Sequence, residues 1–132
     1  MRLNKAGEYA VRCVMHLAKN GNGGVISRRE VAKAMEIPEP FLAKIARQLT
    51  LAGILNVTQG SRGGYRLAKD PNELTLLDVV EAMMGEIFLN ECLCRPQICR
   101  RSPTCITHRI WKKANQQLRS TLKNATIAQI SR

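Results

Sequence analysis

The stretch SRREVAKAMEIPEPFLAKIARQLTLAGILNVTQGSRGGYRLA, residues 27–68, decides the fold. Ser27 and Glu30 have the spacing of a capping box, which predicts that a short helix covers residues 28–35. Two prolines then break the chain. Because proline is tolerated in the first turn of a helix, a second helix is predicted over residues 40–51. Two short helices with a tight break between them are typical of a helix-turn-helix.

The residues after the second helix predict a β-hairpin. Leu55 and Val57 alternate with polar residues, and Tyr65 and Leu67 do so again after a glycine-rich basic segment. A helix-turn-helix followed at once by a basic hairpin predicts a winged helix. The alternative is another small α+β domain with a hairpin. The predicted fold class is therefore mainly α with a small β-hairpin.

The rest of the chain is predicted to be helical around a cysteine-rich loop. Helices are expected over residues 4–19, 76–84 and about 104–122. Cys13 lies on the apolar face of the first of these helices and is expected to be a core residue. The last helix has an apolar stripe at steps of four, formed by Ile106, Ile110, Ala114, Leu118 and Leu122. We expect this stripe to pack against another subunit, with packing on its own domain as the alternative.

These elements suggest a division into two parts. Residues 1–73 would form the winged helix-turn-helix domain that binds DNA. Residues 74–132 would supply a helix, the cysteine loop at about 90–105 and a long C-terminal dimerisation helix.

The composition and net charge of the chain indicate which class of molecule it binds. The chain has 132 residues, 45% of them hydrophobic, and a formal net charge of +11. Such an excess of positive charge indicates a polyanionic partner, nucleic acid first and an acidic membrane surface second. No run approaches the roughly 18 apolar residues of a membrane-spanning helix. There is also no acid–base pair with a pocket signature, no phosphate loop and no nucleophile motif, so we do not expect an enzyme.

The N-terminal residues indicate the compartment. Charge and glycine interrupt the first thirteen residues, so no secretory signal is recognised, and we expect a cytoplasmic protein. In a reducing compartment, clustered cysteines indicate metal or redox chemistry more than structural disulfides.

The predicted winged helix implies a set of DNA contacts. The second helix of a helix-turn-helix enters the major groove by its N-terminal end, and a wing lies along a neighbouring minor groove. Each basic side chain could equally be a solvated surface group. A symmetric dimer would bind a pseudo-palindromic operator in double-stranded DNA. The candidate DNA-binding residues are Arg2, Lys5, Arg28, Glu39, Pro40, Phe41, Lys44, Arg47, Gln59, Ser61, Arg62, Gly63 and Arg66.

Four of the five cysteines lie within residues 90–111, together with His108. Thiolates are soft ligands that suit iron–sulfur clusters and zinc. Zinc would use three cysteines and the histidine, although the C-x2-C spacing typical of zinc folds is absent. The cysteines could instead undergo thiol oxidation without a metal, form a disulfide pair, or lie in an inert loop.

The chain resembles the Rrf-two family of bacterial winged-helix regulators. The resemblance rests on MRLNKAGEYAV at residues 1–11, on GSRGGYRLAKDPNELTLLDVVEAM at residues 60–83, and on C-x5-C-x2-H followed by Trp111. It implies a homodimer whose long helix crosses to the partner. It also implies an iron–sulfur cluster in the cysteine loop, either [2Fe–2S] or [4Fe–4S], whose state changes DNA binding.

The resemblance also implies a set of ligands. The family uses three cysteines at roughly this spacing, and Cys99 and Cys105 match directly. Either Cys92 or Cys94 could be the third, and we favour Cys92 because a wider loop encircles a cluster with less strain.

A fourth, non-cysteine ligand is usual in this family. His108 matches the histidine of IscR-like members, whereas Glu8 lies where NsrR-like members present a carboxylate from the other subunit. We favour His108 and keep Glu8 as the alternative.

The predicted function is that of a dimeric transcriptional repressor that senses iron–sulfur, redox or nitric oxide status. One alternative keeps the DNA-binding fold under the control of thiol oxidation, zinc or a protein partner. A second alternative is an iron–sulfur carrier or electron-transfer protein. Ala43 and Gln59 stand where IscR-like members have a glutamate and an arginine that contact DNA, so the operator is expected to differ from theirs.

Overall fold

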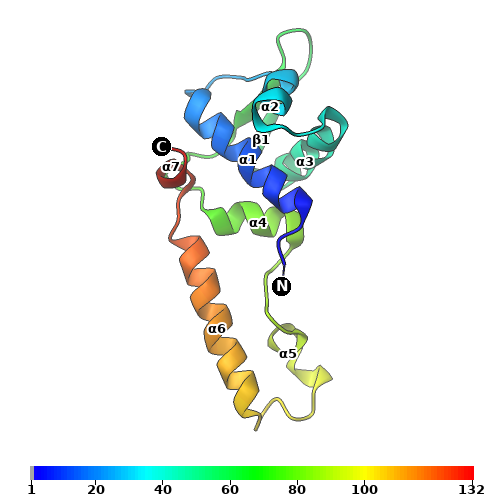
Figure 1. Ribbon diagram of the computed structural model, residues 1–132, viewed down its shortest axis with the longest axis vertical. Coiled ribbons are helices and arrows are strands. Elements are labelled where there is room, and N and C mark those ends of the chain that lie inside the picture. The colour runs from blue at the N-terminus through cyan, green and yellow to red at the C-terminus, as the bar shows by residue number, and fades with distance from the viewer. Residues whose placement is uncertain (1) are drawn as a thin grey trace.

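The computed structural model describes residues 2–132 and is mainly helical, with one two-stranded antiparallel sheet (Figure 1). Helices α1 to α4, the hairpin and α7 form a compact body, and α6 and the α5 segment extend from it in the same direction. The elements are α1 (Lys5–Asn20), α2 (Arg28–Met35), α3 (Glu39–Leu51), β1 (Leu55–Thr58), β2 (Gly64–Leu67), α4 (Leu76–Met84), α5 (Glu91–Cys94), a 3₁₀ turn (Pro96–Ile98), α6 (Ile106–Lys123) and α7 (Ile127–Ile130).

Side-chain caps fix where the helices begin. The hydroxyl of Ser27 accepts a hydrogen bond from the backbone N–H of Glu30 at 3.1 Å, which confirms the predicted start of α2. At α4 the capping box is complete, because Thr75 and Asp78 each accept from the other's backbone N–H. These short polar signals explain why the sequence located the helices well.

The hairpin forms the predicted wing. Strands β1 and β2 pair with Leu55 opposite Leu67 and Thr58 opposite Gly64. Ile26, just before α2, extends the pairing, because it exchanges two backbone hydrogen bonds of 2.9 and 2.8 Å with Tyr65. The winged-helix prediction is confirmed, and the wing is fastened to the start of the helix-turn-helix.

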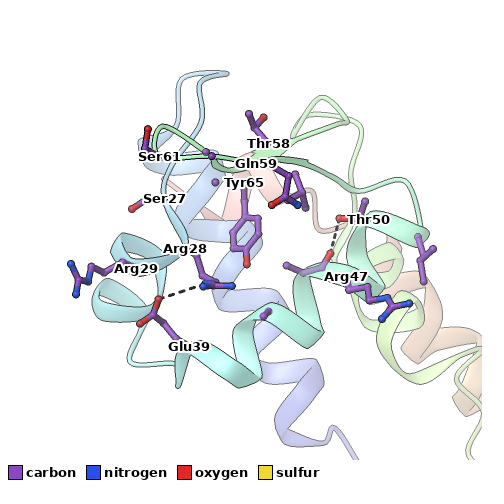
Figure 2. A pocket seen from close by; sticks show the side chains of 17 residues that line it. Ser27, Arg28, Arg29, Glu39, Arg47, Thr50, Thr58, Gln59, Ser61 and Tyr65 are labelled. Carbon is purple, nitrogen blue, oxygen red and sulfur yellow. Dashed lines mark hydrogen bonds and ion pairs between the residues drawn. The ribbon is translucent and has the colours of Figure 1, made fainter.

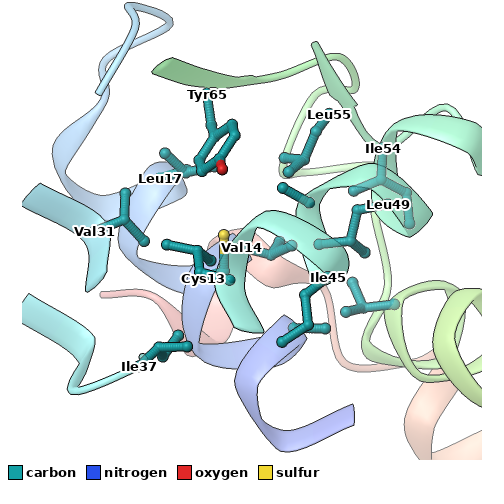
Figure 3. Packing of buried hydrophobic residues seen from close by; sticks show 14 of the residues in the cluster. Cys13, Val14, Leu17, Val31, Ile37, Ile45, Leu49, Ile54, Leu55 and Tyr65 are labelled. Atoms are coloured by element: carbon teal, nitrogen blue, oxygen red, sulfur yellow. The ribbon is translucent and has the colours of Figure 1, made fainter. Parts of the chain in front are cut away.

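One hydrophobic core joins the helix-turn-helix, the hairpin, α1, α4 and α7 (Figure 3). Leu42 and Leu49 of α3 pack there with Val14 of α1, and all three are fully buried. Cys13 also lies in this core, where burial raises the pKa of its thiol to about 12. It is an inert core residue, as its position in the sequence indicated.

The core includes residues from both predicted parts of the chain. Leu74, Val79 and Ile127 belong to the same buried cluster as α1 to α3. The division at residue 73 stays a prediction about function.

The C-terminal segment contains an element that the sequence analysis missed. Thr126 caps α7, and Ile127 donates its backbone N–H to the carbonyl of Leu74 at 2.8 Å. Ile127 is fully buried. The end of the chain therefore returns to the core beside the start of α4.

Helix α6 uses its apolar stripe in two different ways. Leu118 and Leu122 pack against Leu77, Val80 and Ile87 of their own chain. At the other end of the stripe, Ile106 and Ile110 are 73% and 57% exposed, and the neighbouring Trp111 is 42% exposed. The expectation that the whole stripe faces another subunit is therefore wrong for its C-terminal half.

The predicted cysteine loop is not irregular throughout. It contains the single helical turn of α5 and a 3₁₀ turn, and Asn90 precedes α5 without a side-chain cap. Among residues 2–132, no helix is both long enough and apolar enough to cross a membrane.

Candidate DNA interface and cysteine loop

A groove of about 590 Å³ lies between the helix-turn-helix and the hairpin (Figure 2). Its walls are the start of α2, the outer face of α3 and residues 57–61 and 63–65 of the hairpin, and we call it the α3–hairpin groove. Arg28, Arg29 and Arg47 give its walls positive charge. A concave basic surface beside an exposed helix face has the shape and charge expected of a DNA-binding site.

The predicted DNA-binding residues fall into two groups. The groove is lined by Arg28, Glu39, Arg47, Gln59, Ser61 and Gly63. Outside its lining are Arg2, Lys5, Pro40, Phe41, Lys44, Arg62 and Arg66. Arg62 is exposed at the hairpin tip between two groove residues, Ser61 and Gly63, and extends the same surface.

Phe41 lies against α1 and not in the groove. Its ring packs edge-on against Tyr9, with the ring centroids 5.5 Å apart, and it stays 40% exposed. Arg66 is exposed and lies between Tyr65 and Leu67 on β2, whose side chains pack inward. The structure thus separates these two residues from the groove.

Arg28 connects three elements at the groove wall. Its Nε lies 3.6 Å from Oε1 of Glu39, at the start of α3. The hydroxyl of Tyr65, from the hairpin, points toward the same guanidinium in Figure 2. Burial raises the pKa of Tyr65, and the positive charge of Arg28 opposes that rise.

The groove also contains residues that the sequence analysis did not single out. Thr50 and Leu51 line it beside Arg47, and Leu51 is 81% exposed. These positions follow Arg47 by three and four residues, so they share its helix face. That spacing was the signal that could have identified them.

The cysteine-rich segment folds around a cavity of about 260 Å³. Its lining includes all four favoured ligands, Cys92, Cys99, Cys105 and His108, and Trp111 lies beside them. Cys94 is exposed and does not line this cavity. Of the two candidates for the third ligand, only Cys92 lines this cavity, and the choice between them stays a prediction.

The four side chains share the cavity without converging on one point. His108 Nδ1 lies 3.1 Å from Cys92 Sγ. Within residues 2–132, however, no three Cys, His, Asp or Glu side chains approach closely enough to hold a metal ion. Binding of a metal at this cavity would therefore require the segment that carries Cys99 and Cys105 to move closer to Cys92 and His108.

Cys105 has the most favourable surroundings for a thiolate. It is the N-cap residue of α6, and its Sγ lies 2.9 Å from the hydroxyl of Thr107. That hydroxyl and the backbone N–H of His108 lower the pKa of the thiol. The thiolate is the form that ligates metals.

Two further observations bear on whether the cavity suits a metal cluster. Ser102 lines it with a buried Oγ that has no hydrogen-bond partner within the described residues. Three thiols and one imidazole are a donor set that suits iron–sulfur clusters or zinc.

Glu8, the alternative fourth ligand, lies on α1 outside this cavity and pairs with Lys5 at 3.3 Å.

A chain of polar contacts connects α6 to α4. Asn115 accepts a hydrogen bond from the backbone N–H of Leu89 at 2.9 Å. Arg119 forms an ion pair with Glu81 of α4, which also accepts from the backbone N–H of Ile87. Helix α4 packs on α1 and α3 in turn, so it lies between α6 and the helix-turn-helix.

Comparison with known proteins identifies the family. The model of the Rrf2 family, described as iron-dependent transcriptional regulators, matches residues 3–132. The chain belongs to the Rrf2 family. The resemblance noted in the sequence is thereby confirmed, and this Rrf2-family chain is a helix-turn-helix transcriptional regulator and not an enzyme.

The sequence similarity to individual members of the Rrf2 family extends over nearly the whole of this chain. It is 36% identical to protein aau3 of Rhizobium meliloti over 96% of its own length and 82% of that protein. It is 26% identical to the regulator IscR of Photobacterium profundum over 100% of its own length and 76% of that protein.

Solved structures agree on the fold. CymR, described as the global cysteine regulator of B. subtilis, superimposes with a TM-score of 0.83 at 21% identity, covering 99% of this chain and 96% of CymR. IscR of T. potens superimposes with a TM-score of 0.78 at 22% identity, covering 98% of this chain and 85% of that chain.

Proposed function

We propose that this Rrf2-family regulator is a homodimeric repressor whose cysteine loop holds an iron–sulfur cluster, and that the state of the cluster sets its affinity for DNA. The observation that carries the proposal is the presence of Cys92, Cys99, Cys105 and His108 around one cavity. The description of the family as iron-dependent and the similarity to a protein named IscR also support it.

On the DNA side, the proposal rests on shape and charge. The N-terminal end of α3 would enter the major groove, and the hairpin tip with Arg62 would lie along the minor groove beside it. Arg47 and Lys44 are suited to phosphates or to guanine edges. The net charge of +11 would supply most of the sequence-independent affinity.

Replacing Arg47 or Arg62 by alanine is expected to weaken binding to every duplex. Each change should reduce the slope of log K against log salt concentration by about two for the dimer, because each of its two chains loses one phosphate contact and releases one counterion fewer. Fluorescence anisotropy titrations at several salt concentrations measure this slope. Lys123→Ala, an exposed lysine at the C-terminal end of α6 and outside the groove lining, is the control. An unchanged slope for both arginine variants would remove them from the interface.

The dimer is proposed from the exposed end of α6. Ile106, Ile110 and Trp111 are large apolar side chains that remain substantially exposed in the single chain. Such residues gathered on one helix mark an association surface. A two-fold dimer would bind a pseudo-palindromic operator.

The cluster ligands are proposed to be Cys92, Cys99, Cys105 and His108. When bound, the cluster would supply a centre that responds to oxidants and nitric oxide. The chain's own part is to hold the segment around these residues closed. Asn115 and Arg119 would then transmit the position of α6 to the linker before α5 and to α4. The effect on DNA binding is a population shift between two dimer geometries.

The ligand proposal is tested by matched serine variants. Purified anaerobically, the wild type is expected to show a broad visible absorption band with stoichiometric iron and sulfide. Cys92→Ser should lose most of the band and the iron, whereas Cys94→Ser should retain both, because Cys94 lies outside the cavity. A colourless wild type that contains zinc, or no metal after reconstitution, would refute the cluster.

A second candidate is supported by the fold match to CymR, which is described as a cysteine regulator. In that case a protein partner or thiol oxidation would control the same DNA-binding fold. Control by a protein partner predicts that serine variants of all four loop cysteines regulate DNA binding normally.

A further inference from the structure

Glu39 is an acidic residue in the otherwise basic lining of the α3–hairpin groove. It lies in the first turn of α3 and lines the α3–hairpin groove together with Arg28, Arg29 and Arg47. Among the residues that line this groove, Glu39 is the sole carboxylate. Beside DNA a carboxylate repels phosphates, so its position requires a compensating partner.

The ion pair with Arg28 does not by itself explain Glu39. The side chains of Arg28 and Glu39 are 55% and 46% exposed, and exposed ion pairs of this kind contribute little to stability. The shortest contact of the pair joins Arg28 Nε to Glu39 Oε1, at 3.6 Å. Within residues 2–132, no hydrogen bond to Oε2 is present, so one oxygen remains available at the groove.

Arg28 is held from the opposite side by the hairpin. Tyr65, only 4% exposed, points its hydroxyl toward the guanidinium (Figure 2). The backbone of Tyr65 is fixed by its two hydrogen bonds to Ile26. Arg28 thus lies between the hydroxyl of Tyr65 and the carboxylate of Glu39.

We propose that Glu39 accepts a hydrogen bond from a base amine in the major groove, cytosine N4 or adenine N6, and that Arg28 is the positioning residue that aims it. This inference rests on the proposed DNA binding. Cytosine and adenine present amine donors at this edge, whereas guanine and thymine present acceptors that a carboxylate repels. Glu39 would therefore contribute specificity through both attraction and repulsion.

The test is binding-site selection from a pool of random duplexes. The wild type is expected to enrich cytosine or adenine at one position in each half-site. Glu39→Ala should lose the preference at that position alone. Its affinity for the wild-type consensus should fall about fivefold relative to an unrelated duplex. Its affinity for the unrelated duplex should rise, because a charge that repels phosphates is gone.

Two further variants test whether Arg28 positions the carboxylate of Glu39. Arg28→Lys keeps the charge but loses the planar guanidinium, and Tyr65→Phe removes the hydroxyl that faces it. Both variants should weaken the preference for cytosine or adenine at the position that Glu39 contacts. Both should leave the slope of log K against log salt concentration unchanged. Glu73→Ala, at an exposed acid outside the groove, is the control and should change neither.

The outcomes are distinguishable. If Glu39→Ala keeps the full wild-type preference, or weakens binding equally for all sequences, Glu39 does not recognise a base and the inference is overturned. If the wild type enriches no sequence, the proposed DNA binding itself fails, and this inference fails with it.

Discussion

Gly64→Ala is expected to destabilise the protein by at least about 3 kcal/mol and to abolish DNA binding. An alanine Cβ at this position would lie 2.6 Å from the carbonyl carbon of Ile26 and closer still to its carbonyl oxygen. Gly64 also has a φ of +153°, which side-chain-bearing residues rarely adopt. The clash cannot relax easily, because the neighbouring Tyr65 is hydrogen-bonded to Ile26 in both directions.

A glycine in the same hairpin provides the control. Gly60 has a φ of +100°, but an added Cβ would meet no atom within 4 Å. Gly60→Ala should therefore cost only the backbone strain, about 1–2 kcal/mol. Urea unfolding followed by circular dichroism measures both variants. A Gly64→Ala protein no less stable than Gly60→Ala would mean that Ile26 and the hairpin are not in contact as described.

The double variant Ile106→Glu, Ile110→Glu is expected to be monomeric and to bind an operator duplex at least about 100-fold more weakly. Burying two carboxylates at an apolar interface opposes association strongly, because each loses its hydration. A monomer then loses the gain in affinity that comes from engaging two half-sites at once. Light scattering after size exclusion measures the assembly, and anisotropy measures the affinity.

The control for the dimer surface is Gln116→Glu, which adds one negative charge, half of the charge of the double variant, to an exposed position of α6 on the face opposite the apolar stripe. It should remain dimeric with affinity near that of the wild type. Both substituted residues are exposed in the single chain, so the monomeric double variant should still fold, with the helical circular dichroism of the wild type, although it loses the stabilisation that comes from association. A double variant that remains dimeric would place the association surface elsewhere.

Local signals explain why so much of the fold could be predicted from the sequence. The starts of α2 and α4 are marked by side chains that cap them within three residues, and the hairpin is marked by alternation around glycines. Helix α7 also begins with a capping box, formed by Thr126 and Gln129. Its four residues are too few to show helical periodicity, and its backbone bond to Leu74 comes from far along the chain, so the local signal was not recognised.

The candidate sites could be predicted only in part from the sequence, because tertiary contacts bring their residues together. Helical spacing identified the stripe on α6, but it could not show that Leu118 packs on α4 while Ile110 is exposed. Its charge made Arg28 a candidate DNA-binding residue in the sequence. The pairing of Arg28 with Glu39 joins two helices and is visible only once the chain is folded.

The central claim is that the state of the cysteine loop controls DNA binding. The most direct test is the Kd of one selected duplex, measured anaerobically for the same preparation before and after the cluster is removed by chelation. We expect the two values to differ by at least about tenfold, a coupling of ordinary size for an allosteric regulator. The Cys92→Ser variant should show one value under both conditions. Equal affinities for the cluster-loaded and cluster-free wild type would contradict the claim.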